Sequence, residues 1–182
     1  MTGNVRGVFK RVTVMQGETR VSDDPAVVMT TVLGSCISAC FFDPVAKVGG
    51  LNHFLLAEPG QAGTDPASMQ RYGVYAMEVL INAMLALGAS RTSLRARIYG
   101  GASMHDGLHD IGAANAAFAR RFLKDERIIL VGEDVGGRDA KRVEFRPTLG
   151  LARCRTAAEP AFVPIRRHTP PAHRPSGDVE FF

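Results

Sequence analysis

The 182-residue sequence contains no tryptophan and only three cysteines, and it has no long apolar run and no block of like charge. Its cysteines, Cys36, Cys40 and Cys154, are too few and too unevenly spaced for a disulfide framework, and no CxxC pair suggests a zinc site. No segment approaches the roughly 18 consecutive apolar residues that span a bilayer, and the N-terminus lacks an apolar signal segment. We therefore expect a cytoplasmic protein with reduced thiols.

The composition that is present fits a folded domain with a buried core. Apolar residues make up 46% of the chain, and the formal net charge of +4 is spread along the sequence. A spread of this kind indicates an ordinary solvated surface, although a mildly basic face would also suit an acidic protein partner. We predict one domain over residues 1–157, followed by a proline-rich tail over residues 158–182 that is extended or disordered.

Two apolar runs separated by a turn predict a β-hairpin. Residues 36–42 form the first run, Asp43-Pro44 supplies type I turn residues, and residues 48–56 form the second run. If the turn is centred between Pro44 and Val45, paired residue numbers sum to 89, and Cys36 faces His53. Directly opposed Cβ atoms lie about 4.5–5.5 Å apart, so the two side chains could share a proton. A one-residue change of register would place them on opposite faces of the sheet.

The remaining pattern alternates irregularly between strand and helix. Strands are predicted over residues 27–32, 94–99, 127–131, 141–145 and 151–155, and helices over residues 71–87 and 110–125, with Asp110 as a cap for the second. Because βα units do not repeat regularly, this order indicates an α+β layered sandwich with mixed or antiparallel sheets rather than a doubly wound parallel sheet.

Cys36 is the best candidate for a nucleophile. It follows Gly34-Ser35 at the junction of two strands, where backbone N–H groups left out of the ladder could bind an oxyanion. Cys40 and Cys154 lie inside apolar strands, which is typical of core cysteine. A lone histidine in an apolar setting, such as His53, is usually structural, and only the predicted pairing with Cys36 favours a base. Thr30 is the candidate to orient the imidazole, through its hydroxyl or its carbonyl.

Two further motifs are weaker. His105 and His109 have the spacing of a metal-binding helix face, but Gly107 between them favours a loop, so no metal and no cofactor are expected. Gly100-Gly101 lacks both the strand-GxGxxG-helix context of dinucleotide binding and the lysine of a P-loop. A glycine-rich wall beside the active site is the better interpretation.

Several ordered blocks resemble one protein family. They are Thr30 with Cys36 in a Thr-x5-Cys motif, Asp43-Pro44, Gly49-Gly50-Leu51-Asn52-His53-Phe54, Arg71-Tyr72-Gly73, Gly100-Gly101-Ala102, Ile111-Gly112-Ala113-x-Asn115, and Gly136-Gly137 before Arg142-Val143-x-Phe145. Together, from about Val12 to Arg155, they resemble CheD, the chemoreceptor glutamine deamidases of bacterial and archaeal chemotaxis. Two departures are Leu51, where the family usually has Met, and Phe54-Leu55, where it usually has Leu-Pro.

The resemblance implies a specific chemistry. It assigns the nucleophile to Cys36, the base to His53 and the third catalytic position to Thr30, in a three-layer α/β/β sandwich with two main helices. It implies methyl-accepting chemotaxis receptors as substrates, association with receptor arrays, and a CheC-type phosphatase as a possible partner.

Other functions stay open on the sequence. A non-catalytic chemotaxis adaptor or phosphatase regulator would keep the same motifs, and a thiol protease or transamidase would share the Cys/His pair. Four arginines, Arg95, Arg97, Arg120 and Arg121, are candidates to meet acidic receptor helices, although an ordinary solvated surface is the favoured explanation for them.

Overall fold

The computed structural model describes residues 8–56, 65–103 and 111–157. These residues form the elements β1 (Lys10–Thr13), β2 (Thr19–Ser22), β3 (Val27–Leu33), β4 (Ile37–Asp43), β5 (Val48–Asn52), α1 (Pro66–Ala86), β6 (Arg95–Gly100), α2 (Ile111–Asp125), β7 (Ile129–Val135), β8 (Lys141–Arg146), the short 3-10 helix η1 (Pro147–Leu149) and β9 (Leu151–Thr156). Neither of the two α-helices in this described part is both long and apolar enough to cross a membrane. The predicted tail lies outside the described residues.

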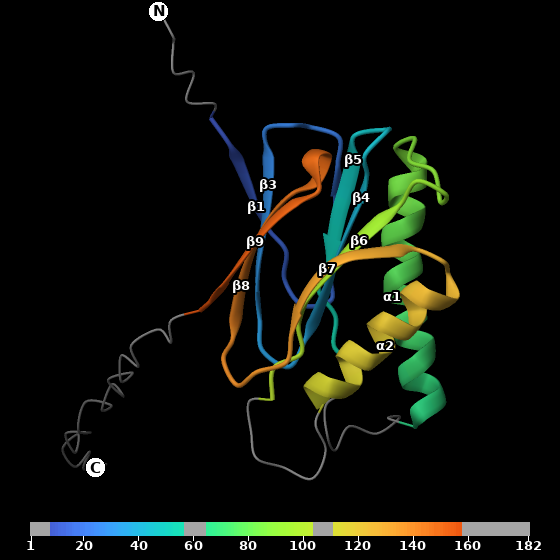
Figure 1. Cartoon of the computed structure of the whole chain (residues 1–182), viewed down its shortest axis with the longest axis vertical. Coiled ribbons are helices and arrows are strands. Elements are labelled where there is room, and N and C mark those ends of the chain that lie inside the picture. The colour runs from blue at the N-terminus through green and yellow to red at the C-terminus, as the bar shows by residue number, and fades with distance from the viewer. Residues whose placement is uncertain (1–7, 57–64, 104–110, 158–182) are drawn as a thin grey trace, which may run out of the picture.

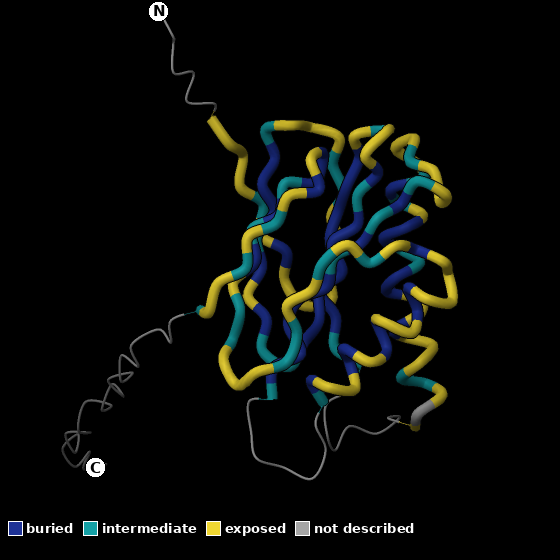
Figure 2. The backbone as a smooth tube through the Cα atoms, in the orientation of Figure 1, coloured by how far each residue is buried: buried dark blue, intermediate teal, exposed yellow. Residues whose placement is uncertain are grey.

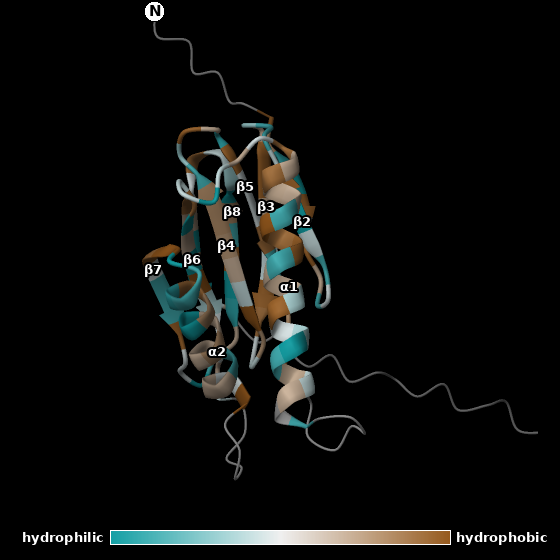
Figure 3. Ribbon diagram, turned by 90° about the vertical axis from the view of Figure 1, so that its right-hand side faces the viewer, coloured by the Kyte–Doolittle hydropathy of each residue, from teal (hydrophilic) through white to brown (hydrophobic). Residues whose placement is uncertain are grey.

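Two sheets and a helix layer make up the fold (Figure 1). One sheet has the strand order β1-β3-β8-β9 and the other β2-β5-β4-β6-β7. Both helices cover the outer face of the five-stranded sheet (Figure 3), and the helices, this sheet and the four-stranded sheet form three successive layers (Figure 1). Parallel pairs (β1 with β3, β6 with β7) occur beside antiparallel ones, which makes both sheets mixed. The prediction of an α+β, α/β/β sandwich is confirmed.

Burial of β4 on both faces explains its continuous apolar sequence. Its side chains Ile37, Ala39 and Phe41 pack with the helices, while Cys40 packs between the sheets together with Leu51. A strand covered on both sides has no polar face to alternate with the apolar one. The most buried backbone accordingly runs through the middle of the molecule, with exposed residues on the helices and loops around it (Figure 2).

Helix α1 begins where a capping residue allows it. The carboxylate of Asp65 accepts hydrogen bonds from the N–H groups of Ala67 and Ser68, which places the start of the helix five residues before the predicted Arg71. The strand and helix positions from residue 27 onward otherwise follow the prediction within a few residues. The strands β1 and β2 were not predicted, because their four-residue sequences are mostly polar and none of their residues is buried.

The β4–β5 hairpin has a wider turn than predicted. Asp43 pairs with Val48, and its carboxylate accepts hydrogen bonds from the N–H groups of Val45 and Ala46 while Lys47 adopts a left-handed φ of 58°. Paired residues therefore sum to 91, as in the pair Cys40 and Leu51, rather than 89. The prediction that Cys36 directly faces His53 is wrong. Because the shift is two residues, it preserves the face on which each side chain lies.

Candidate active site

Cys36 lies in the connection between β3 and β4, at the edge of the interior. The residue is 8% exposed. The carbonyl of Cys36 accepts a hydrogen bond from Gly101 N–H at 2.7 Å, and Ala102 N–H donates to the Gly34 carbonyl at 2.8 Å. Gly100, with φ of 104°, lies so close that any side chain there would overlap the Cys36 carbonyl oxygen. The Gly100-Gly101 segment therefore packs directly against the thiol-bearing backbone.

Asn115 of α2 fixes the same connection from the other side. This fully buried amide donates from Nδ2 to the Ser35 carbonyl at 2.8 Å and accepts from Leu56 N–H at Oδ1 at 2.9 Å. One side chain thus ties the residue before Cys36 to the segment that follows His53. A polar residue on the apolar face of α2 was the available signal, since a buried amide needs partners on both atoms.

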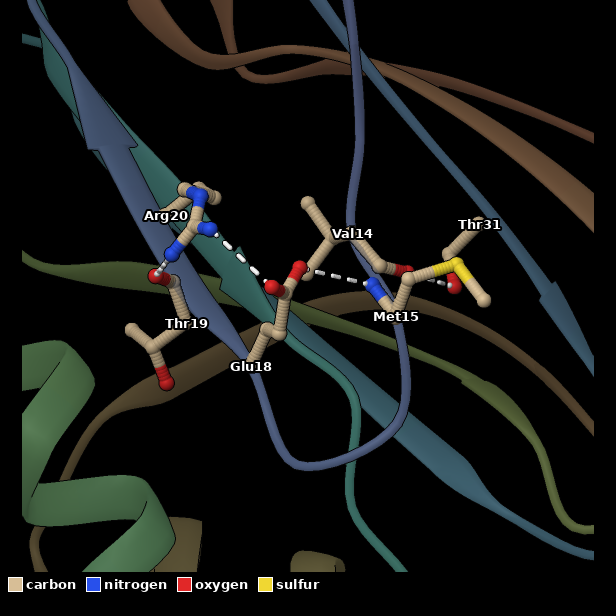
Figure 4. Close-up of polar contacts among 6 residues, drawn as sticks. All are labelled: Val14, Met15, Glu18, Thr19, Arg20 and Thr31. Carbon is tan, nitrogen blue, oxygen red and sulfur yellow. Dashed lines mark hydrogen bonds and ion pairs between the residues drawn. The ribbon is translucent and has the colours of Figure 1, made fainter.

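His53 follows β5 and faces the space between the two sheets, where its partner is Thr31. The Thr31 hydroxyl donates to the Val14 carbonyl at 2.8 Å and lies 2.9 Å from His53 Nδ1; Figure 4 shows the Thr31–Val14 bond. Since a hydroxyl carries one proton, and that proton is given to Val14, the His53 Nδ1–H must be the donor to the Thr31 oxygen. This tautomer leaves the lone pair on Nε2.

Nε2 is the free nitrogen of the ring. It is buried and has no hydrogen-bond partner among the residues described. Burial lowers the pKa of His53 below its ordinary value, an effect that the nearby Val14 carbonyl partly offsets. A neutral imidazole with an unprotonated Nε2 is the state that a general base requires at neutral pH.

The geometry does not match the expected position of Thr30. Its hydroxyl lies 3.4 Å from that of Thr13, and its carbonyl accepts the N–H of Val14. Alternate residues of a strand point to opposite faces, and in β3 the odd-numbered residues, such as Met29 and Leu33, face the second sheet. Thr31 therefore points into the space between the sheets, where it contacts His53, and Thr30 points to the other side of β3.

The two central residues approach each other diagonally. Ile37 and Phe54 form an isolated antiparallel bridge, and Cys36 and His53 each precede one member of it. The Cys36 thiol donates its hydrogen bond to the side-chain oxygen of Gln16 at 3.4 Å. Gln16 belongs to a turn that is bonded to the His53 backbone, since Gly17 N–H donates to the His53 carbonyl at 2.7 Å. The Gln16 turn thus connects the thiol to the backbone of His53, and nothing in the sequence pattern had indicated it.

The remaining sequence candidates lie away from this site or outside the described residues. Burial raises the pKa of Cys40 to about 12 and that of Cys154 to about 11, so neither is a ready thiolate. His105 and His109 fall in the undescribed range 104–110, and the described residues contain no group of side chains suited to a metal ion.

Most of the candidate arginines already contact other parts of the chain. Arg97 donates to the Gly150 carbonyl at 3.0 Å, and Arg121 lies 6.0 Å from the centre of the Phe118 ring. Arg120 forms two hydrogen bonds of 2.9 Å with Glu133. A receptor contact by Arg120 would therefore compete with an existing ion pair.

A cavity of about 240 Å³ reaches His53 from the side of α1. Its walls come from the turn before β2, the end of β5 and one face of α1, and they include Gly17, Thr19, Asn52, Phe54, Tyr72, Tyr75, Ala76 and Val79. The two tyrosines are exposed to solvent, whereas His53 is only 7% exposed. The cavity thus opens beside exposed aromatic side chains and has His53 in its wall, on the side of β5 where Asn52 contacts α1.

Comparison with known sequences identifies the family of these residues. A family model described as "CheD chemotactic sensory transduction" matches residues 55–156. A Zymomonas mobilis protein named "Probable chemoreceptor glutamine deamidase CheD" is 60% identical over 174 residues, which cover 96% of this chain and 93% of that protein. A Caulobacter vibrioides protein of the same name is 54% identical over 175 residues, which cover 94% of this chain and 93% of that protein.

Comparison with solved structures supports the fold alone. A Neisseria meningitidis protein of the DUF152 family superposes with a TM-score of 0.50 at 12% sequence identity. The match covers 71% of this chain and 65% of that one. The layered arrangement of sheets and helices is therefore shared with a protein of very different sequence.

Proposed function

The chain belongs to the CheD family, and on that premise we propose that it is a protein-glutamine deamidase that acts on methyl-accepting chemotaxis receptors. The observation that carries the proposal is the state of His53, whose Nδ1–H is held by Thr31 while Nε2 is left with its lone pair. That arrangement supplies a base on the same sheet face as a thiol, and amide hydrolysis by a cysteine needs both.

The reaction begins with the thiol proton. In the proposed mechanism, His53 Nε2 takes the proton from Cys36 Sγ, and the thiolate attacks the side-chain carbonyl carbon of a receptor glutamine. A bond forms between sulfur and carbon, and the carbonyl electrons move to oxygen. Backbone N–H groups of the connection before Cys36 stabilise this oxyanion, and Asn115 holds the connection in place through Ser35.

Two further steps complete the balance. The His53 imidazolium gives its proton to the departing amine, so that ammonia leaves and a thioester remains. The neutral imidazole then activates a water molecule, which attacks the thioester and releases glutamate and the Cys36 thiol. The net change is one amide and one water converted to one carboxylate and one ammonium ion, so each event adds a negative charge to the receptor.

The surroundings of the site suit a side chain delivered by another protein. The cavity that has His53 in its wall lies beside the solvent-exposed side chains of Tyr72 and Tyr75. Glutamine is long enough to extend from a receptor helix into such a cavity while the helix stays outside. We therefore propose the cytoplasmic helices of the receptors as substrates. We also propose that the protein is located in the cytoplasm at receptor arrays and that a CheC-type phosphatase is a partner.

Cys36→Ser tests the assignment of the nucleophile. Incubated with a purified receptor cytoplasmic fragment, the wild-type protein should convert specific glutamines to glutamate, as read by mass spectrometry. The variant should lose conversion by about 10³-fold or more, because a neutral hydroxyl is a far weaker nucleophile than a thiolate. Cys154→Ser, which alters a thiol away from the site, should keep wild-type rates.

Other outcomes would point elsewhere. Wild-type rates in Cys36→Ser would end the nucleophile assignment. Tight binding of the fragment with no conversion by the wild-type protein would favour the non-catalytic adaptor, and cleavage of the peptide backbone would favour a protease.

A further inference from the structure

The Cys36 thiol is hydrogen-bonded to a carboxamide of its own chain. Cys36 Sγ donates to Gln16 Oε1 at 3.4 Å, whereas His53 Nε2 has no partner among the described residues. The acceptor is the same functional group, on the same length of side chain, as the proposed substrate. In this structure the thiol proton is therefore directed to an internal glutamine rather than to the base.

The backbone around Gln16 holds it at this place. Residues Met15 to Glu18 form a four-residue turn in which Glu18 N–H donates to the Met15 carbonyl at 3.0 Å. Gly17 occupies the third position with φ of 84°, the left-handed value that a type II turn requires. The Glu18 side chain closes the turn, accepting from Met15 N–H at 3.0 Å and pairing with Arg20 at 3.0 Å (Figure 4).

The turn is also hydrogen-bonded to the backbone of the residue that carries the base. Gly17 N–H donates to the His53 carbonyl at 2.7 Å, and His53 N–H donates to the Glu18 carbonyl at 3.0 Å. Val14, just before the turn, accepts the Thr31 hydroxyl that fixes the imidazole tautomer. Gln16 is therefore anchored to the same backbone as His53, and its contact with the thiol is a built feature of the site.

We propose that Gln16 is an internal competitor of the substrate: its carboxamide occupies the place that the receptor glutamine must take and keeps the Cys36 thiol away from His53. The inference rests on the proposed function for its substrate, but not for its effect on the thiol. The Gln16 residue is exposed, so its side chain can rotate into solvent while the backbone of the turn stays bonded to His53. An arriving glutamine displaces it, and the released thiol proton can then pass to Nε2.

Alkylation of Cys36 tests the effect on the thiol without any deamidase substrate. Iodoacetamide should label Cys36 about fivefold faster in Gln16→Ala than in the wild-type protein, because one hydrogen bond and one occupant are removed. Gln16→Glu should slow labelling below the wild-type rate, since a neighbouring carboxylate disfavours the thiolate. Met15→Ala, on the same turn, should leave the rate unchanged, and mass spectrometry separates Cys36 from Cys40 and Cys154.

A kinetic measurement separates competition from assistance. With a receptor cytoplasmic fragment, Gln16→Ala should lower KM about fivefold and leave kcat within twofold. A lower kcat with an unchanged KM would overturn the proposal, because Gln16 would then assist the chemistry. Unchanged or slower alkylation in Gln16→Ala would overturn it as well. If no variant and no wild-type sample converts glutamine, the deamidase assignment fails while the alkylation series still decides the role of Gln16.

Discussion

The two ends of the β4–β5 hairpin both contain a buried titratable side chain, but the side chain is fully hydrogen-bonded at one end and only partly hydrogen-bonded at the other. At the turn, Asp43 accepts hydrogen bonds from the N–H groups of Val45, Ala46 and Ser90 and from the Ser93 hydroxyl. At the open end, His53 is held through Nδ1 only, and Nε2 has no partner in the described part of the chain.

The difference shows which end stabilises the fold and which is available for chemistry. Desolvation opposes the charge of Asp43, yet the hydrogen bonds from Ser93, Ser90, Ala46 and Val45 outweigh it and lower the pKa to about 2. A fully satisfied carboxylate of this kind fixes the turn and is inert. A half-satisfied imidazole costs stability, because a buried polar atom without a partner loses its hydration. It keeps a lone pair ready for a proton.

Asp43→Ala should have the largest effect and should act on stability. The substitution leaves several buried donors without an acceptor, so the free energy of unfolding should fall by about 3 kcal/mol. Urea denaturation with an unchanged m value would measure it. The rate per folded molecule should stay within about threefold of wild type, since the turn is at the far end of the hairpin.

Asp24 offers a matched control for the turn. Its carboxylate also accepts a backbone N–H, that of Ala26, but in an exposed turn. Asp24→Ala should therefore cost less than about 1 kcal/mol. Loss of activity without loss of stability in Asp43→Ala would break the comparison between the two ends.

Thr31→Val should have a smaller effect and should act on catalysis. The two side chains have nearly the same shape, but valine cannot accept the His53 Nδ1–H or donate to Val14. We expect kcat to fall about 30-fold, because the imidazole loses the bond that fixes its tautomer and orientation. KM should change little. Nitrogen chemical shifts of the His53 ring should show Nδ1 protonated in the wild-type protein and a mixture of tautomers in the variant.

Thr30→Val is the control for this position. Its side chain lies on the other face of β3, near Thr13, so kcat should stay within about threefold of wild type. A loss in Thr30→Val equal to or greater than that in Thr31→Val would contradict the assignment of the orienting hydroxyl to Thr31.

Sequence periodicity predicted the layers because the central elements carry long patterns. The apolar spacing in α1 and the two-sided apolar run of β4 are set by burial against two layers, so they appear in the sequence itself. The edge strands β1 and β2 have only four residues each, and none of these residues is buried. Their order comes from pairing with β3 and β5, which leaves no local apolar signal.

The sequence predicted the site only where the alternation of side chains along a strand decided which face a residue lies on. Cys36 and His53 stayed on one face because widening the turn changed the register by two residues. The choice between Thr30 and Thr31 depended on which face of β3 meets the second sheet. Because β3 has apolar residues at both odd and even positions, its sequence does not show which face that is. Gln16 could not be identified at all, since its contact with the thiol arises from a turn anchored on a strand more than 30 residues later in the chain.

The pH dependence of stability gives the smallest effect and distinguishes the two ends directly. The folded pKa of His53 is below its ordinary value of about 6.5, so on acidification the unfolded chain binds a proton that the folded one resists. Stability is therefore fully present above about pH 6.5 and declines as the pH falls toward the folded pKa. Asp43, with a folded pKa of about 2, instead loses its contribution as the pH falls from the ordinary carboxyl pKa of 3.8 toward 2. The difference between the unfolding free energies of wild type and His53→Gln should decrease on acidification only in the pH range below about 6.5 that belongs to His53, and not in the range of Asp43. A difference that is flat from pH 7.5 to 5 would mean that the fold leaves the pKa of His53 at its ordinary value, and a difference that grows on acidification would mean that the fold favours the charged imidazolium.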